Sequence, residues 1–273
     1  MELLYGRTAK SLIETEIKEK LMSIKKNGEN VRISLFRVGE RDDDCGYERS
    51  ILKSCDRLGI CADANVFPED VKESDLVRAL QHSAADEAVD GILLFRPLPK
   101  NLQTESILTA IPAVKDIDGM LLDKSAFTPC TPEACMQILR AYQIEPKGKR
   151  CVVIGRSAVV GKPLARLLTE AGAIVTVCHT QTPDVPAETR KADLLFVACG
   201  KPNMVDEHYL SDGQIVIDVG FHVLENGFCG DVNAEAVAKM ASAYTPVPGG
   251  VGAVTLSVLL LHAVTAHERK TRR

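Results

Sequence analysis

The stretch VVIGRSAVVGKPLA, residues 152–165, decides the fold. It has the pattern of a buried strand, a tight turn and the first turns of a helix. Gly155 permits the turn and Gly161 lets the helix approach the strand, so backbone N–H groups at the helix N-terminus can face a pyrophosphate. Because the spacing is G-x-S-x-x-x-G rather than G-x-G-x-x-G, a structural turn without a ligand remains an alternative. The stretch favours a nucleotide-binding loop.

Short apolar runs recur on both sides of this loop. The runs CVVIG, IVTVC, DLLFVACG and QIVIDVG follow one another at about 20-residue spacing, with the helical segment KPLARLLTEAG between the first two. Continuous Val, Ile and Leu strands, rather than alternating ones, are typical of a parallel sheet that is buried on both faces. We therefore expect a Rossmann-type, doubly wound parallel sheet in the second half of the chain.

The strand after the loop bears on the choice of cofactor. An NAD site usually offers an acid about 20 residues on for the ribose 2′-hydroxyl. Here IVTVC is followed by His179 and Thr180 without a carboxylate, while Arg156 lies in the loop. A cation with hydroxyl groups suits a 2′-phosphate, which an acid would repel. The sequence favours NADP over NAD, and His179 is more typical of a hydrogen-bonded strand end than of a catalyst.

The first half alternates helical and strand patterns. We expect a helix over 11–26 with Leu12 on its apolar stripe, an alternating strand over 31–39, a helix that carries Tyr47, and a buried strand in VDGILLF. Thr131 precedes Pro132 as the N-cap of a further helix. The last helix, from about residue 255 to 269, is apolar enough to pack back onto the first lobe. The expected fold is thus α/β with two lobes and a cleft between them: 1–120 plus 256–273, and 121–255.

Composition excludes several classes of function. A net charge of −4 and a pI near 5.9 give no general attraction to nucleic acid or to an anionic membrane. No apolar run approaches the roughly 20 residues of a membrane span, and no secretory signal is evident. Nine cysteines, an odd number without a C-x-x-C pair, indicate a reducing compartment. We expect a cytoplasmic protein without a metal site.

Three irregular stretches complete the pattern: PLP (97–99), KDIDG (115–119) and TPVPGGVGAVT (245–255). Each alone could be a tight turn between lobes. Together with VVIGRSAVVGKP, ADLLFVACGKP, IVIDVG and GDV they closely resemble the methylenetetrahydrofolate dehydrogenase/cyclohydrolase family over essentially the full length. The resemblance implies a folate-binding lobe, an NAD(P) lobe, a cytoplasmic homodimer, and use of NADP with tetrahydrofolate one-carbon derivatives.

The resemblance also assigns residues. It implies that Tyr47 stacks on the folate ring system and that Asp118 holds the pterin edge, both as catalytic and substrate-binding residues. Pro248, Gly249 and Gly250 match the loop that flanks the folate. The matching cofactor-binding positions are Gly155, Arg156, Ser157, Gly161 and Thr180, the last standing where the family often has a serine.

Three positions depart from the family pattern. The family keeps a lysine, the acid/base of the cyclohydrolase step, four residues after the tyrosine, and this chain has Ile51. The glutamine that supports that lysine is replaced by Phe95, and a serine three residues before the tyrosine by Asp44. Asp44 and Arg96 are candidates for a new ion pair. The paired loss of lysine and glutamine indicates one lost activity.

Four hypotheses follow. The first is an NADP-dependent oxidation of 5,10-methylenetetrahydrofolate to the 5,10-methenyl form, with the cyclohydrolase step to 10-formyltetrahydrofolate doubtful. Hydride transfer needs mainly that two rings be held face to face, and the residues for that remain. The others are the full bifunctional activity, a non-catalytic binding paralogue, and a dehydrogenase with a changed substrate.

Overall fold

The computed structural model describes residues 1–102, 104–225 and 227–271. Its contacts divide the chain into two compact units, which we call the sheet-A unit (Met1–Ile13 with Pro129–Val258) and the sheet-B unit (Glu14–Thr128 with Leu259–Arg273). This division by contacts groups residues 1–13 with the second half of the chain, because the first strand pairs there.

The sheet-A unit is built on a six-stranded parallel sheet. Its strands, in spatial order, are β1 (Glu2–Leu3), β11 (Ala243–Tyr244), β8 (Ile215–Asp218), β7 (Leu194–Val197), β5 (Arg150–Ile154) and β6 (Ile174–Cys178). The four apolar runs of the sequence are the four strands from β8 to β6, so the expected doubly wound sheet is confirmed. Among these four strands, burial is continuous on β7 and weakest on β6, an edge strand whose Ile174 is 62% exposed.

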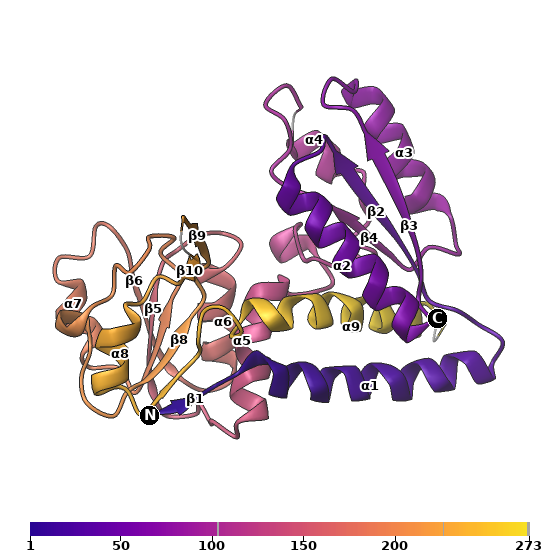
Figure 1. Ribbon diagram of the computed structural model, residues 1–273. Coiled ribbons are helices and arrows are strands. Elements are labelled where there is room, and N and C mark those ends of the chain that lie inside the picture. Colours follow the sequence, from indigo (N-terminus) through magenta and orange to yellow (C-terminus); the bar gives the residue numbers. More distant parts are fainter. Residues whose placement is uncertain (103, 226, 272–273) are drawn as a thin grey trace. The chain divides into compact units, whose positions relative to one another are not determined.

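Helices cover this sheet on both sides (Figure 1). They are α5 (Cys130–Ala141), α6 (Gly161–Glu170), α7 (Val185–Thr189) and α8 (Ala234–Met240), with a 3₁₀ turn at Glu207–Tyr209. A separate antiparallel hairpin consists of β9 (His222–Leu224) and β10 (Gly227–Cys229). The predicted cap of α5 was wrong: Pro129 occupies the N-cap position and Thr131 lies inside the helix, where its hydroxyl does not cap it.

The sheet-B unit has a three-stranded parallel sheet in the order β3 (Cys61–Phe67), β2 (Arg32–Val38), β4 (Gly91–Leu94). Its helices are α2 (Asp42–Leu58), α3 (Glu73–Ala85) and α4 (Thr104–Leu108), with a 3₁₀ turn at Leu122–Lys124. Strand β2 was expected to alternate between buried and exposed residues. It is instead buried along six of its seven residues, because it is the central strand.

Two long helices, α1 (Gly6–Lys26) and α9 (Gly252–Thr271), contribute to both units. The C-terminal half of α9 packs on the sheet-B unit, as predicted: Nδ1 of His262 lies 2.8 Å from the carbonyl oxygen of Ile117, and Lys270 pairs with the buried Asp90. Helix α1 starts five residues earlier than the pattern indicated. Leu12, assigned to its apolar stripe, is 58% exposed, whereas Ile13 and Ile17 are buried.

The described residues contain neither a membrane-spanning helix nor a cluster of metal ligands. No helix among residues 1–102, 104–225 and 227–271 has the length and apolar character needed to cross a membrane. In the same ranges, no three His, Cys, Asp or Glu side chains gather in a way that could hold a metal ion.

Candidate active site

The loop between β5 and α6 contains two glycines at which any larger side chain would clash with the backbone. Gly155 has φ +120°, and a Cβ there would lie 2.2 Å from the carbonyl oxygen of Ala198. A Cβ on Gly161 would lie 2.1 Å from the carbonyl oxygen of Gly155. The helix therefore starts in direct contact with the turn, and the turn in direct contact with the loop after β7.

Ser157 changes the expected role of the helix N-terminus. Its hydroxyl oxygen accepts hydrogen bonds from the backbone N–H groups of Val160 (3.1 Å) and Gly161 (3.4 Å), and its carbonyl oxygen accepts from Lys162 (3.0 Å). These three N–H groups are satisfied inside the protein and do not face outward. A pyrophosphate at this turn would have to rely on the loop residues before them, such as Arg156 and Ser157.

Arg156 is exposed and oriented by a residue that the sequence analysis missed. Its Nη2 donates to Oε1 of Gln181 (3.1 Å), in the loop after β6. That loop is a tight turn in which His179 and Thr182 exchange two hydrogen bonds, so His179 has the structural part predicted for it. Thr180 is exposed beside it. A cation and hydroxyl groups thus stand together at the carboxyl ends of β5 and β6, with no carboxylate in the segment 178–182.

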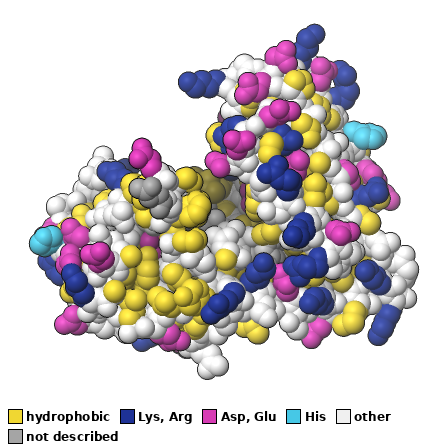
Figure 2. Space-filling view, viewed as in Figure 1, with side chains coloured by type: hydrophobic (Ala, Val, Ile, Leu, Met, Phe, Trp, Pro, Cys, Tyr) yellow, Lys and Arg dark blue, Asp and Glu magenta, His cyan; other side chains and the backbone are white. Residues whose placement is uncertain are grey.

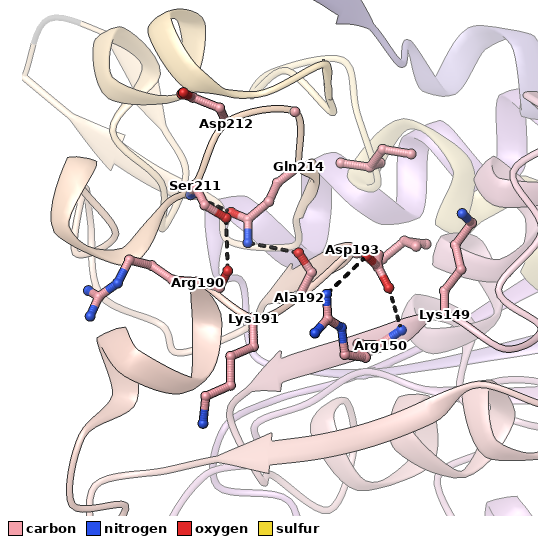
Figure 3. A pocket seen from close by; sticks show the side chains of 12 residues that line it. Lys149, Arg150, Arg190, Lys191, Ala192, Asp193, Ser211, Asp212 and Gln214 are labelled. Carbon is pink, nitrogen blue, oxygen red and sulfur yellow. Dashed lines mark hydrogen bonds and ion pairs between the residues drawn. The ribbon is translucent and has the colours of Figure 1, made fainter.

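A pocket of about 300 Å³ lies at the opposite, amino-terminal ends of β5, β7 and β8 (Figure 3). It is rich in cations, but their side chains point in different directions and several are already paired. Arg150 lies 3.6 Å from Asp193, Lys191 pairs with Glu188 at 2.7 Å, and Arg190 donates to a backbone carbonyl. Dinucleotides bind at the carboxyl ends of parallel strands, so this pocket is not the cofactor site.

In the sheet-B unit, Tyr47 stands against Phe95. The ring centroids are 6.0 Å apart and the ring planes meet at 74°, an edge-to-face contact. Phe95 directly follows β4 and is 6% exposed, while Ile51, one helical turn after Tyr47, is 0% exposed. The two positions that the sequence analysis singled out as substituted, 51 and 95, therefore both carry buried apolar side chains.

Two ion pairs surround this apolar patch. Asp44, 8% exposed, accepts two 2.9 Å hydrogen bonds from Arg41, which also donates to the carbonyl oxygen of Arg96. Arg96 was a candidate partner of Asp44 in the sequence, but the carboxylate pairs with Arg41, three residues earlier at the start of α2. On the same face of α2, Glu48 pairs with the buried Arg37 of β2 at 2.9 Å.

The two acids of the KDIDG segment differ in burial and in hydrogen bonding. Asp116, 1% exposed, accepts hydrogen bonds from the backbone N–H groups of Met120 and Leu121, so it holds the turn. Its neighbour Lys115 donates to three carbonyl oxygens at the end of α3, and burial lowers the pKa of its ammonium group. Asp118 is half-buried. Of the two acids, Asp118 is the one with solvent access for a ligand.

The Pro248–Gly249–Gly250 loop belongs to the sheet-A unit and is fixed by the start of α1. The N–H of Gly6 donates to the carbonyl oxygen of Gly249 (2.8 Å), and a Cβ on Gly6 would lie 2.2 Å from the carbonyl oxygen of Gly250. Pro248 and Gly249 themselves are exposed, and Gly249 has φ +101°. The loop thus presents an exposed proline and a glycine on a rigid base.

Comparison with known families and curated proteins gives the same result for both halves of the chain. The model of the tetrahydrofolate dehydrogenase/cyclohydrolase catalytic domain matches residues 4–118, and the model of the NAD(P)-binding domain of the same family matches residues 129–271. The bifunctional protein FolD of Clostridium botulinum (strain Langeland) is 40% identical over 280 residues, with 99% of each chain covered. The chain belongs to this family.

Solved structures of the family share the fold. The bifunctional FolD methylenetetrahydrofolate dehydrogenase/cyclohydrolase of Campylobacter jejuni is 38% identical, with a TM-score of 0.93 and coverage of 98% of this chain and 99% of the other. The Trypanosoma brucei enzyme, solved in complex with NADP and an inhibitor, is 31% identical, with a TM-score of 0.91 and coverage of 99% and 98%.

The tetrahydrofolate dehydrogenase/cyclohydrolase fold thus gathers the predicted residues into two groups, one in each unit. The cofactor positions Gly155, Arg156, Ser157 and Gly161 form one turn, with Thr180 on the neighbouring loop. Tyr47, Ile51 and Phe95 form the second group, bordered by Asp44. Sequence reasoning missed Gln181, Arg41 and the Arg37–Glu48 pair. The i, i+4, i+7 stripe formed by Asp44, Glu48 and Ile51 was the available signal for the last of these.

Proposed function

We propose that this protein oxidises 5,10-methylenetetrahydrofolate to the 5,10-methenyl form with NADP. The observation that carries the choice of cofactor is the exposed Arg156, held by Gln181 of the segment 178–182, which includes Thr180 and has no carboxylate. A guanidinium group there complements a 2′-phosphate. The tight Gly155–Gly161 turn fits a nucleotide, and the Trypanosoma brucei relative was solved with NADP.

The chain's own residues would act by binding and orienting. Bound NADP supplies the hydride acceptor, so the protein needs chiefly to align two rings. We assign the folate ring to the face of Tyr47, whose orientation is fixed by edge-to-face contact with Phe95. The carboxylate of Asp118 would accept hydrogen bonds from the N–H groups of the pterin. Pro248, Gly249 and Gly250 stay proposed substrate-binding residues, since two of them, Pro248 and Gly249, are exposed on the sheet-A unit.

The cyclohydrolase step is, in this proposal, slow or absent. Water attack on the methenyl bridge needs a positioned acid or base, and the side chains of Ile51 and Phe95 carry no proton to exchange. The alternative is the full bifunctional activity, which the names of the curated and solved relatives favour. A non-catalytic or substrate-changed paralogue would instead fail to form the methenyl product. One assay separates them: methylenetetrahydrofolate with NADP or NAD, with formation and decay of the methenyl absorbance followed separately.

Replacing Arg156 tests the cofactor assignment. Arg156→Ala is expected to weaken NADP binding by about 1–3 kcal/mol, the worth of a charged hydrogen bond, and to leave NAD binding nearly unchanged. Fluorescence titration with both reduced cofactors measures the difference. Arg166→Ala is the matched control, because Arg166 is an exposed arginine of α6 that pairs with Glu170. Equal losses for the two cofactors would show that Arg156 does not contact the 2′-phosphate.

We further propose a cytoplasmic homodimer that pairs through the hairpin β9–β10. All nine cysteines are free thiols, which suits a reducing compartment. The hairpin exposes Phe221 (56%), Val223 (69%) and Phe228 (51%), and its two phenylalanine rings stack at 5.2 Å. Hydrophobic side chains gather on the face that carries it (Figure 2). A two-stranded ribbon with apolar side chains and open edges suits pairing with a second copy.

Phe228→Asp is expected to dissociate this dimer. Each copy loses one buried aromatic side chain, worth about 1.5–3 kcal/mol, and a two-fold interface loses it twice. Sedimentation over a range of concentrations should show a rise in the dimer dissociation constant of about a hundredfold or more. Leu12→Asp, at an exposed leucine of α1, is the control. If Phe228→Asp leaves the dimer intact, the interface lies elsewhere on the protein. If the unmodified protein is a monomer, the homodimer proposal is wrong.

A further inference from the structure

The loop after β7 is fixed by hydrogen bonds to a buried carboxylate. Asp231, 0% exposed, accepts hydrogen bonds at Oδ2 from the backbone N–H groups of Cys199 (2.7 Å) and Gly200 (2.9 Å). Gly200 has φ +68°, and no atom of the described residues lies within 4 Å of where its Cβ would be. The inner side of this loop is therefore fixed to Asp231, while the side toward Gly200 Cα is open.

Asp231 is itself oriented from two directions. Its Oδ1 lies 2.7 Å from Nε2 of His222, and its backbone N–H donates to Asp218 (3.0 Å). Asp218, 1% exposed at the end of β8, also accepts hydrogen bonds from the N–H of Val232 (3.0 Å) and the hydroxyl of Tyr244 (3.1 Å). Burial raises the pKa of Asp218 to about 6. Two adjacent buried carboxylates are costly to keep. Asp231 holds the loop at Cys199–Gly200, and Asp218 holds the backbone of Asp231.

This loop lies at the point where a dinucleotide crosses the sheet. Strand β5 has β6 on one side and β7 on the other, so the connections leave it in opposite directions. Dinucleotides bind at such a switch point, across the carboxyl ends of the two diverging strands. The loops after β5 and β7 touch, since the N–H of Ala198 donates to the carbonyl oxygen of Ile154 (2.8 Å) and a Cβ on Gly155 would meet Ala198.

The direction of the bound cofactor follows from the charges. Arg156 and Thr180 stand on the β6 side of the switch point and suit the 2′-phosphate of the adenosine half. A dinucleotide that passes over the Gly155 turn from there must place its nicotinamide half on the β7 side. The open side of Gly200 is then next to the nicotinamide half, where a Cβ would stand in the way of a flat ring.

We propose that Asp231, oriented by His222, is a positioning residue for the nicotinamide half of the cofactor. It binds no ligand itself; its carboxylate fixes the backbone at Cys199 and Gly200 against which that half lies. The inference rests on the NADP-dependent activity proposed above. It assigns a function to the GDV motif and to His222 that neither the cofactor loop nor the folate residues supply.

A comparison of two ligands tests the proposal. NADPH spans both halves of the site, whereas adenosine 2′,5′-bisphosphate fills the adenosine half alone. His222→Ala should weaken NADPH binding about three- to tenfold, part of the effect of a full charged hydrogen bond, and leave the fragment's affinity unchanged. His222→Gln, whose amide N–H can still donate to Asp231, should restore most of the loss. The His222 side chain is 21% exposed, so the truncation leaves no closed cavity.

The controls separate this proposal from a purely structural one. Arg156→Ala should weaken both ligands, and His208→Ala, at an exposed histidine of the same unit, should weaken neither. A general loosening of the fold by His222→Ala would lower the melting temperature and both affinities together, and would overturn the proposal, as would unchanged NADPH binding. If the unmodified protein binds both ligands but His222→Ala does not show the expected loss, only the positioning proposal is overturned and the proposed function stands. If the unmodified protein binds neither ligand, both proposals are overturned.

Discussion

The unmodified protein is expected to hydrolyse 5,10-methenyltetrahydrofolate at close to the rate of buffer alone, while it still reduces NADP with methylenetetrahydrofolate. A positioned acid or base contributes about 10²–10⁴-fold to such a step. The two positions that would supply it are Ile51, 0% exposed, and Phe95, 6% exposed and in contact with Tyr47. Decay of the methenyl absorbance with and without protein measures the rate, and formation of the same absorbance reports the dehydrogenase step.

The paired substitution Ile51→Lys with Phe95→Gln should restore part of the hydrolysis. Ile51→Lys alone should restore less, because Phe95 offers the ammonium no hydrogen-bond acceptor and so leaves its pKa poorly tuned. Ile51→Met with Phe95→Leu is the control, since it changes both side chains without adding a proton donor or acceptor. Hydrolysis well above buffer in the unmodified protein would favour the bifunctional alternative, with Asp44, Arg96 or an ordered water as the candidates for the missing group.

The parts of the fold that could be predicted are the buried strands that consist of continuous apolar runs. Strands β5, β6, β7 and β8 each correspond to such a run, and the Gly155–Gly161 turn follows from its glycines. Strands β1 and β11 are two residues long and carry no period that a pattern could reveal. Their pairing moves residues 1–13 into the sheet-A unit, and only three-dimensional contacts could show this.

The sequence predicted the glycines of the candidate site and the positions that match the family. It was less informative about which charged and polar side chains pair with one another. The partner of Asp44 depended on which arginine reaches it first: Arg41 lies one helical turn away, whereas Arg96 would have to reach from the strand end. Gln181 was missed because a polar contact between distant segments leaves no periodic signal. The Arg37–Glu48 pair left half a signal: the helical stripe marked Glu48 as buried, but nothing in the pattern pointed to Arg37 of β2 as its partner. The different surroundings of Asp116 and Asp118 in KDIDG also required the structure, since two acids two residues apart look equivalent in sequence.

The second large effect is expected from Gly161→Ala. A Cβ at this position would lie 2.1 Å from the carbonyl oxygen and 2.6 Å from the carbonyl carbon of Gly155, both backbone atoms that cannot rotate away. The turn has no room to retreat, because the opposite side of Gly155 faces the carbonyl oxygen of Ala198. Helix α6 must therefore shift from β5, which disturbs the fold and the cofactor loop together.

We expect Gly161→Ala to lower the free energy of unfolding by about 1–3 kcal/mol, the usual cost of overpacking, and to weaken NADP binding at least tenfold. Urea denaturation and fluorescence titration measure the two effects. Gly252→Ala is the matched control: Gly252 is likewise the first residue of a helix, α9, and no atom of the described residues lies within 4 Å of its Cβ position. That change should stabilise the protein by about 0.4–1 kcal/mol through the unfolded chain. If the two alanines behaved alike, the contact between α6 and the Gly155 turn would not be what shapes the cofactor loop.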